Sequence, residues 1–267
     1  MNWSGSVCLV TGASSGIGRA VAHALARRGA TVIVSARRES RLEQLIEELD
    51  SDRHWYVVCD VTDLESVKAM AAAVAQRTDR LDLLVNNAGR PGAGLIAEST
   101  PEEVDNVVKT NLTGAIWCTQ LLHDLMDAGP RTRRLPAVVN VASMAGRIPL
   151  PGAATYAATK FGMVGFSEAL WAEMRNRDIG VTVVNPGLVH TEGFPMDEVL
   201  ATPLLRRMVM SPERIAEALC DGVERGRAEV RVQQWWTPIY YLLFALGPYR
   251  RRLLRLFLRL VNKSVTT

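Results

Sequence analysis

Cysteine is scarce in this sequence, with four residues in 267: Cys8, Cys59, Cys118 and Cys220. No two of them form a CxxC pair, and none stands near the four histidines at a spacing typical of metal ligands. We therefore expect reduced, buried thiols in a cytoplasmic protein and no metal site. The N-terminal stretch "MNWSGSVCLVTG" also lacks a basic segment and a long apolar run, so we expect no signal peptide.

Acidic residues are missing from the end of the chain, since none follows Glu229. Seven basic residues do follow it: Arg231, Arg250, Arg251, Arg252, Arg255, Arg259 and Lys263. Because the whole chain carries a net charge of +3, the stretch after Glu229 contributes +7 and the rest of the chain −4. A nucleic-acid binder would spread its basic residues over a folded face among stacking aromatics, so we expect no nucleic-acid partner.

Linkers, repeats and low-complexity segments are lacking before residue 232, and 48% of the chain is apolar. Short β-branched runs alternate with longer helical patterns, which is typical of βαβ units, and the runs are continuously apolar, as in buried parallel strands. We predict an α/β, doubly wound fold with seven mostly parallel strands, in one domain of residues 1–232 followed by a tail, 233–267. The expected strands are 6–10, 30–35, 54–58, 81–85, 136–143, 180–186 and 228–232. The expected helices are 16–29, 39–50, 63–78, 101–128, about 155–176 and about 212–225.

A glycine-rich loop, "TGASSGIG", follows the first expected strand and opens the first helix. Gly12, Gly16 and Gly18 would let the backbone turn tightly and approach a pyrophosphate, whose charge would face the helix N-terminus. The position of the loop in a βα chain indicates a dinucleotide site of the Rossmann type. The alternative is a glycine-rich turn that serves packing only.

The end of the second expected strand indicates which dinucleotide binds. It reads "VSARRES", with Arg37 and Arg38 where an acidic residue would accept the ribose hydroxyls of NAD(H). A guanidinium suits a phosphate, so this segment favours NADP(H) over NAD(H). The alternative is a pair of solvated loop arginines.

These motifs, in this order, resemble the short-chain dehydrogenase/reductase family from residue 5 to about residue 232. The resemblance also covers Asp60 in "CDVTD", the "NNAG" segment from Asn86 to Gly89, and "PGLVHT" from Pro186 to Thr191. One departure is Ser15, where many NADP-preferring relatives have a basic residue, so the phosphate site would depend on Arg37 and Arg38. The resemblance implies these cofactor-binding residues: Gly12, Ser14, Ser15, Gly16, Ile17, Gly18, Arg37, Arg38, Asp60, Val61, Asn87, Ala88, Gly89, Tyr156, Lys160, Pro186, Gly187, Val189 and Thr191.

The stretch "TYAATK" places Tyr156 and Lys160 four positions apart, on one face of a helix, where an ammonium would stabilise a phenolate. The resemblance implies that Tyr156 is the general acid or base and that Ser143 hydrogen-bonds the substrate oxygen. It further implies that Lys160 holds the nicotinamide ribose, and that Asn111 bends its helix to hold a water that links Lys160 to solvent. We therefore predict an NADP(H)-dependent oxidoreductase that interconverts a carbonyl and a secondary alcohol by hydride transfer. An NAD-dependent enzyme and a non-catalytic dinucleotide sensor remain alternatives.

Two segments of the domain bear on partners. The helix after Tyr156 is rich in small residues, and in the family it forms a dimer interface, so we expect a homodimer or homotetramer. The segment 193–210, "GFPMDEVLATPLLRRMVM", is where relatives cover the substrate, and its apolar residues predict a lipophilic substrate. Ordinary packing of a surface helix would explain these apolar residues equally well.

The tail has a sequence pattern of its own. Fifteen uncharged residues, Trp235–Tyr249, would form a helix of about 22 Å, too short to span a membrane. After Pro248, a helical projection gathers Arg251, Arg252, Arg255 and Arg259 on one face and apolar residues on the other. This pattern is typical of a helix that lies in a membrane interface, and it predicts a peripheral membrane protein. Alternatively, the tail packs on a neighbouring subunit or over the active site.

Overall fold

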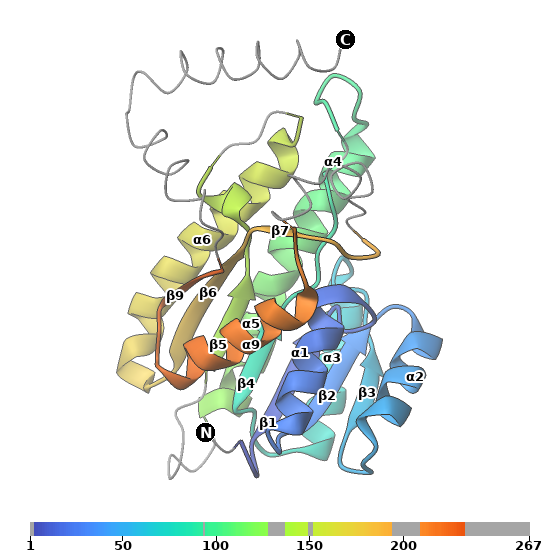
Figure 1. The fold of residues 1–267 in the computed structure, drawn as a ribbon, viewed down its shortest axis with the longest axis vertical. Coiled ribbons are helices and arrows are strands. Elements are labelled where there is room, and N and C mark those ends of the chain that lie inside the picture. Colours follow the sequence, from blue (N-terminus) through green and yellow to red (C-terminus); the bar gives the residue numbers. More distant parts are fainter. Residues whose placement is uncertain (1–2, 93, 128–136, 149–151, 194–208, 233–267) are drawn as a thin grey trace. The chain divides into compact units, whose positions relative to one another are not determined.

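The computed structural model describes residues 3–92, 94–127, 137–148, 152–193 and 209–232 (Figure 1). These residues belong to one compact unit that ends at Val232. The tail, 233–267, and residues 194–208 of the expected substrate cover lie outside the described residues. In the described part of the chain, no helix combines the length and apolar character needed to cross a membrane. All four cysteines are buried, as expected.

A seven-stranded sheet forms the centre of the unit, and every neighbouring pair of its strands is parallel. The strand order is β3-β2-β1-β4-β5-β6-β9, so the order reverses between β1 and β4. The prediction of a doubly wound sheet is thereby confirmed. The strands are β1 (Val7–Thr11), β2 (Thr31–Ala36), β3 (Trp55–Val58), β4 (Leu83–Asn86), β5 (Ala137–Val141), β6 (Gly180–Pro186) and β9 (Glu229–Val232). A separate parallel pair, β7 (Leu188–Val189) with β8 (Val209–Met210), was not expected.

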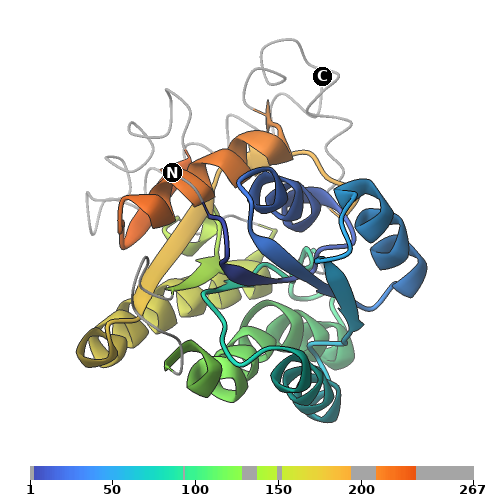
Figure 2. The ribbon, with the colours of Figure 1, turned by 90° about the horizontal axis from the view of Figure 1, so that it is seen from below.

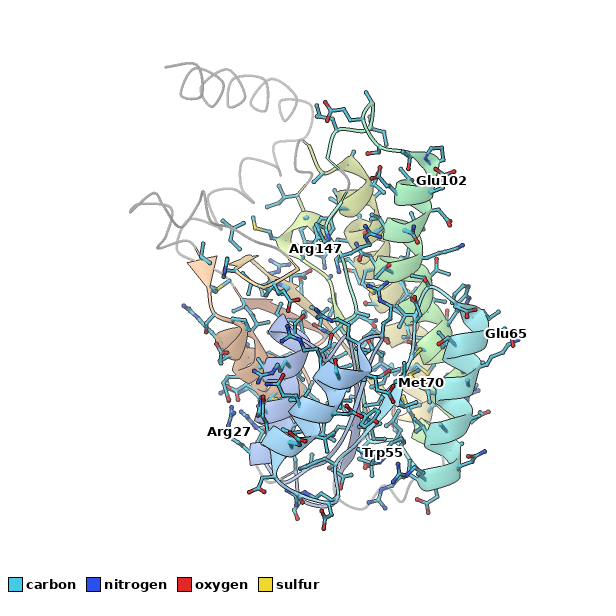
Figure 3. All side chains as sticks on the ribbon, turned by 90° about the vertical axis from the view of Figure 1, so that its right-hand side faces the viewer. Arg27, Trp55, Glu65, Met70, Glu102 and Arg147 are labelled. Carbon is cyan, nitrogen blue, oxygen red and sulfur yellow. The ribbon has the colours of Figure 1, made fainter. Side chains whose placement is uncertain are left out.

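Helices cover both faces of the sheet, as Figure 2 shows from below. On one face lie α1 (Gly16–Arg27), α2 (Glu39–Leu49) and α9 (Pro212–Glu224), and on the other lie α3 (Leu64–Arg77), α4 (Pro101–Val108), α5 (Gly114–Asp127) and α6 (Ala154–Met174). Each of these helices except α4 buries its apolar side against the strands, whereas α4 packs against α6 and the turn that follows α4. On α3, for example, Met70 is fully buried and contacts Ser35 of β2, whereas Glu65 points into solvent (Figure 3).

The expected helix 101–128 is interrupted. It begins after a capping box, in which Thr100 and Glu103 each accept a hydrogen bond from the other's backbone N–H. Residues Lys109–Thr113 then form a π-helical turn between α4 and α5. Such turns interrupt the ordinary hydrogen-bond ladder and are frequent at functional sites. This turn contains Asn111.

Candidate active site

A cavity of about 610 Å³ lies at the carboxyl ends of the strands, where the strand order reverses. Ligands of open α/β sheets bind at this position. Every predicted cofactor-binding residue except Gly18 lines the cavity, as do three of the four predicted catalytic residues, Ser143, Tyr156 and Lys160. The structure therefore brings segments from the whole length of the domain together at one site.

The glycine loop forms a close-fitting wall of this cavity. Gly12 and Gly16 have positive φ angles of +65° and +56°, a conformation that favours glycine. A Cβ at Gly12 would lie 2.7 Å from Ala88 Cα, and one at Gly16 would lie 2.9 Å from Thr191 Cγ2. Glycine therefore keeps this wall open at the N-terminus of α1, which fits the pyrophosphate of a dinucleotide. Gly18 does not line the cavity, but any side chain there would collide with Asn87, 2.4 Å away.

Thr11, at the end of β1, joins the glycine loop to the loop after β4. Its hydroxyl donates to the Val85 carbonyl (3.2 Å) and accepts from the backbone N–H groups of Asn87 (3.1 Å) and Ala88 (3.2 Å). The Asn87 amide in turn donates to the Thr11 carbonyl at 3.0 Å. Sequence analysis did not single out Thr11, although it is the first residue of the "TGASSGIG" motif. It fixes the spacing of two cavity walls.

Arg38 connects three parts of the cavity wall. One nitrogen, Nη2, donates to the hydroxyls of Ser14 (3.0 Å) and Ser15 (3.1 Å), and the other, Nη1, donates to the carboxylate of Glu192. The guanidinium thus places a positive charge beside Ser15, the position at which a basic residue was missing. Arg37 is more exposed, at 72% of its side chain, and lies 3.8 Å from the Asp60 carboxylate.

The predicted catalytic pair lies at the other end of the cavity, on α6. Lys160 is 4% exposed, and its Nζ donates to the Val141 carbonyl at 2.9 Å and lies 5.7 Å from the centre of the Tyr156 ring. The Ser143 side chain hydrogen-bonds Tyr156. Its oxygen also accepts from the backbone N–H of Ala145 (3.1 Å), which fixes the serine at the end of β5.

Burial dominates the ionisation of this pair. It raises the pKa of Tyr156 above its ordinary value, and the hydrogen bond with Ser143 only partly opposes this effect. Burial also lowers the pKa of Lys160 to about 8. Burial therefore opposes the phenolate in the protein without cofactor, and the role of the Lys160 ammonium, which lies over the ring, in favouring the phenolate stays a prediction.

Asn111 does not line the cavity and is fully buried. Its side-chain oxygen accepts from the Arg90 backbone N–H (2.8 Å), and its amide donates to the Arg90 carbonyl (2.9 Å) and to Thr159 Oγ1 (3.3 Å). The π-helical turn thus holds the loop after β4 against α6. That loop contributes Arg90, Pro91 and Gly92 to the cavity, three residues that sequence analysis missed although they directly follow "NNAG".

Comparisons with known proteins identify the family. The profile of the family described as "short chain dehydrogenase" matches residues 6–197. The chain belongs to this family. The 3-oxoacyl-acyl-carrier-protein reductase FabG of Thermotoga maritima is 34% identical over 229 residues, which cover 85% of this short-chain dehydrogenase and 86% of the relative. Membership confirms the prediction of an NAD(P)-dependent oxidoreductase.

Two solved structures share the fold of this short-chain dehydrogenase. A variant of actinorhodin polyketide ketoreductase with NADPH is 34% identical, with a TM-score of 0.75, and the match covers 85% of this chain and 95% of that one. A family member from Burkholderia phymatum in complex with NAD is 25% identical, with a TM-score of 0.75 and coverage of 86% and 90%.

Proposed function

We propose that this short-chain dehydrogenase is an NADP(H)-dependent ketoreductase that acts on a lipophilic, acyl-type ketone. The observation that carries the proposal is the convergence of Ser143, Tyr156 and Lys160 on one cavity whose opposite wall is the glycine loop. The names of the relatives, a 3-oxoacyl reductase and a polyketide ketoreductase, support the substrate class. The apolar segment 193–210 supports a lipophilic substrate.

The cofactor would lie along the cavity, with its pyrophosphate at the N-terminus of α1. Arg37 and Arg38 would hold the 2′-phosphate of NADP(H), since a guanidinium offers paired N–H donors to phosphate oxygens. Val189 and Thr191 would hold the nicotinamide carboxamide, and Lys160 the nicotinamide ribose. NAD(H) is the second candidate, because the Burkholderia phymatum relative is described in complex with NAD.

When bound, the reduced nicotinamide supplies the hydride that reduces the ketone carbon. Tyr156 donates its phenolic proton to the ketone oxygen, and the raised pKa of Tyr156 keeps that proton in place at neutral pH. The Ser143 hydroxyl hydrogen-bonds the same oxygen and orients it. Lys160 stabilises the phenolate that remains. The phenolate would regain its proton from Lys160, and Lys160 would take a replacement from solvent through a water held near Asn111. Oxidation of the alcohol reverses each transfer.

The test is reduction by the purified protein, followed through the absorbance of NADPH, with β-ketoacyl thioesters and hydrophobic cyclic ketones as substrates. We expect turnover, and we expect Tyr156→Phe to lower kcat by about a thousandfold or more without loss of NADPH binding. Tyr56→Phe, at a partly buried tyrosine outside the cavity whose hydroxyl contacts Glu39 and Glu43, is the matched control and should keep full activity. NADPH binding without turnover of any ketone would favour the sensor, and full activity of Tyr156→Phe would refute the mechanism.

The tail remains a membrane proposal that comes from its sequence alone. Its uncharged stretch and its basic, amphipathic segment would attach the enzyme to an anionic surface. Flotation with anionic liposomes should carry the full-length chain upward and leave behind a chain that ends at Gln234. Equal flotation of the two, with NADPH binding intact in the shorter chain, would refute the proposal.

Self-association is a further proposal. Two large apolar residues of α6, Phe161 and Trp171, are 42% and 44% exposed, and their burial between two copies would stabilise a homodimer or homotetramer. Light scattering at micromolar concentration should therefore give at least a dimer. A monomeric mass would contradict this.

A further inference from the structure

Glu192 directly follows Thr191 and lines the cavity, yet no role at the site was expected for it. Its carboxylate pairs with the guanidinium of Arg38, which comes from the end of β2, so the two residues are 154 positions apart in sequence. Arg38 lowers the pKa of Glu192, and Arg41 contributes in the same direction. The carboxylate is therefore ionised at neutral pH.

The contacts of Arg38 are those that a phosphate would need. A guanidinium presents its N–H donors as a planar fork, and Arg38 uses Nη1 for Glu192 and Nη2 for Ser14 and Ser15. The serine hydroxyls can donate to a phosphate as well as accept from Arg38. The Glu192 carboxylate can only accept, and it repels an anion. The two serine partners of Arg38 are therefore compatible with a bound phosphate, and Glu192 competes with it.

We propose that Glu192 competes with the 2′-phosphate of the cofactor for Arg38, and thereby limits how strongly the enzyme prefers NADP(H) to NAD(H). The proposal rests on the proposed function, in which Arg38 binds that phosphate. Binding of NADP(H) must break or weaken the Arg38–Glu192 pair, whereas NAD(H), which has no 2′-phosphate, leaves the pair in place. Glu192 is thus a specificity-determining residue and takes no part in hydride or proton transfer.

The test compares the dissociation constants of NADPH and NADH, measured by fluorescence titration of the full-length protein, before and after Glu192→Gln. The substitution keeps the size of the side chain and removes its charge. We expect NADPH to bind about two- to fivefold more tightly, the modest change typical of an exposed ion pair, and NADH to bind as before. In an Arg38→Ala background, Glu192→Gln should change NADPH affinity little, because the contested guanidinium is gone.

Glu39→Gln is the matched control. Glu39 directly follows Arg38 in sequence, does not line the cavity, and contacts the Tyr56 hydroxyl at 3.2 Å. Glu39→Gln removes the same charge close to Arg38, but Glu39 is not a partner of the Arg38 guanidinium for which Glu192 and the phosphate would compete. We expect NADPH affinity to change less than in Glu192→Gln.

Three results would overturn the proposal: unchanged or weaker NADPH binding in Glu192→Gln, an equal gain for NADH, or an equal gain in Glu39→Gln. The variant Arg38→Ala distinguishes failure of the competition by Glu192 from failure of the proposed phosphate site at Arg38. If Arg38→Ala weakens NADPH binding but Glu192→Gln does not tighten it, only the competition is refuted. If Arg38→Ala leaves NADPH binding unchanged, the phosphate site at Arg38 is refuted, and the competition with it.

Discussion

The two ends of the cavity hold their polar side chains in different ways. At the catalytic end, Ser143 is 9% and Lys160 4% exposed, and both are held by backbone groups. At the opposite end, the side chains of Arg37 and Arg38 are 72% and 44% exposed, and their partners are other side chains. At the catalytic end, the side chains are thus held in fixed positions away from water. At the other end, the arginine side chains lie in water and can exchange one partner for another.

This difference in burial decides how strongly a substitution at each end should affect turnover, stability and cofactor choice. Removing a buried polar group leaves its partners without hydrogen bonds and exposes the full cost of their lost hydration. Removing an exposed charge costs little, because water and salt already screen it. Substitutions at the catalytic end should therefore act strongly on turnover and stability, and those at the other end should act weakly and on cofactor choice.

After Tyr156→Phe, the largest effect should come from Ser143→Ala. Without the hydroxyl, the ketone oxygen loses a hydrogen bond that strengthens as negative charge develops, so kcat should fall by about a hundredfold or more. The pKa of Tyr156 should also rise further, since the bond with Ser143 opposes the effect of burial. Steady-state rates over a pH series measure both changes, and NADPH affinity is the control, expected to stay constant. A normal kcat in Ser143→Ala would show that the Ser143 hydroxyl does not hydrogen-bond the ketone oxygen during reduction.

Asn111→Ala should come next, with an effect on stability. The substitution leaves the part-buried N–H and carbonyl of Arg90 without the amide that pairs with both. We expect the free energy of unfolding to fall by about 2–3 kcal/mol, as measured by urea denaturation. The neighbouring Thr110→Ala loses a single bond, to the Asn106 carbonyl, and should cost less than about 1 kcal/mol. Equal losses in the two variants would contradict a special role for the buried amide.

Lys160 should make stability depend on pH. Its pKa is about 8 in the folded protein and 10.5 ordinarily, so the unfolded chain holds more protons between these values. The free energy of unfolding of the wild type, relative to that of Lys160→Met, should therefore rise by about 2 kcal/mol from neutral pH to pH ~10. This gain in stability should be lost as the pH falls back through the folded-state pKa. Lys68→Met, at an exposed lysine, is the control. A difference that stays flat over this range would mean that Lys160 is not dehydrated.

Most of the fold, and most of the cavity lining, could be predicted because the signals are local in sequence. The apolar runs that became β1, β4 and β5 need no knowledge of their neighbours, and the glycines stand within one eight-residue motif. Even the alternation of strands and helices is enough to predict the doubly wound order.

What could not be predicted depends on contacts between distant segments. The resemblance implied a bend in the helix at Asn111, but it did not reveal that the buried Asn111 side chain bonds with Arg90 and Thr159, neither of them a sequence neighbour. The partnership of Arg38 with Glu192 joins residues 154 positions apart. The raised pKa of Tyr156 could not be predicted for a similar reason, since helical spacing places Lys160 near the ring but does not reveal how far burial removes water from the site.

The smallest effect should come from Arg37→Ala. Arg37 is the more exposed of the two arginines, and its ion pair with Asp60 spans 3.8 Å. Its attraction for a 2′-phosphate is therefore well screened, and we expect kcat/KM for NADPH to fall by about two- to fivefold, less than for Arg38→Ala, with little change for NADH. Comparison of kcat/KM with both cofactors measures this. A wild-type preference for NADH that Arg37→Ala leaves untouched would refute the phosphate assignment, and a loss as large as that of Ser143→Ala would break the contrast between the two ends of the cavity.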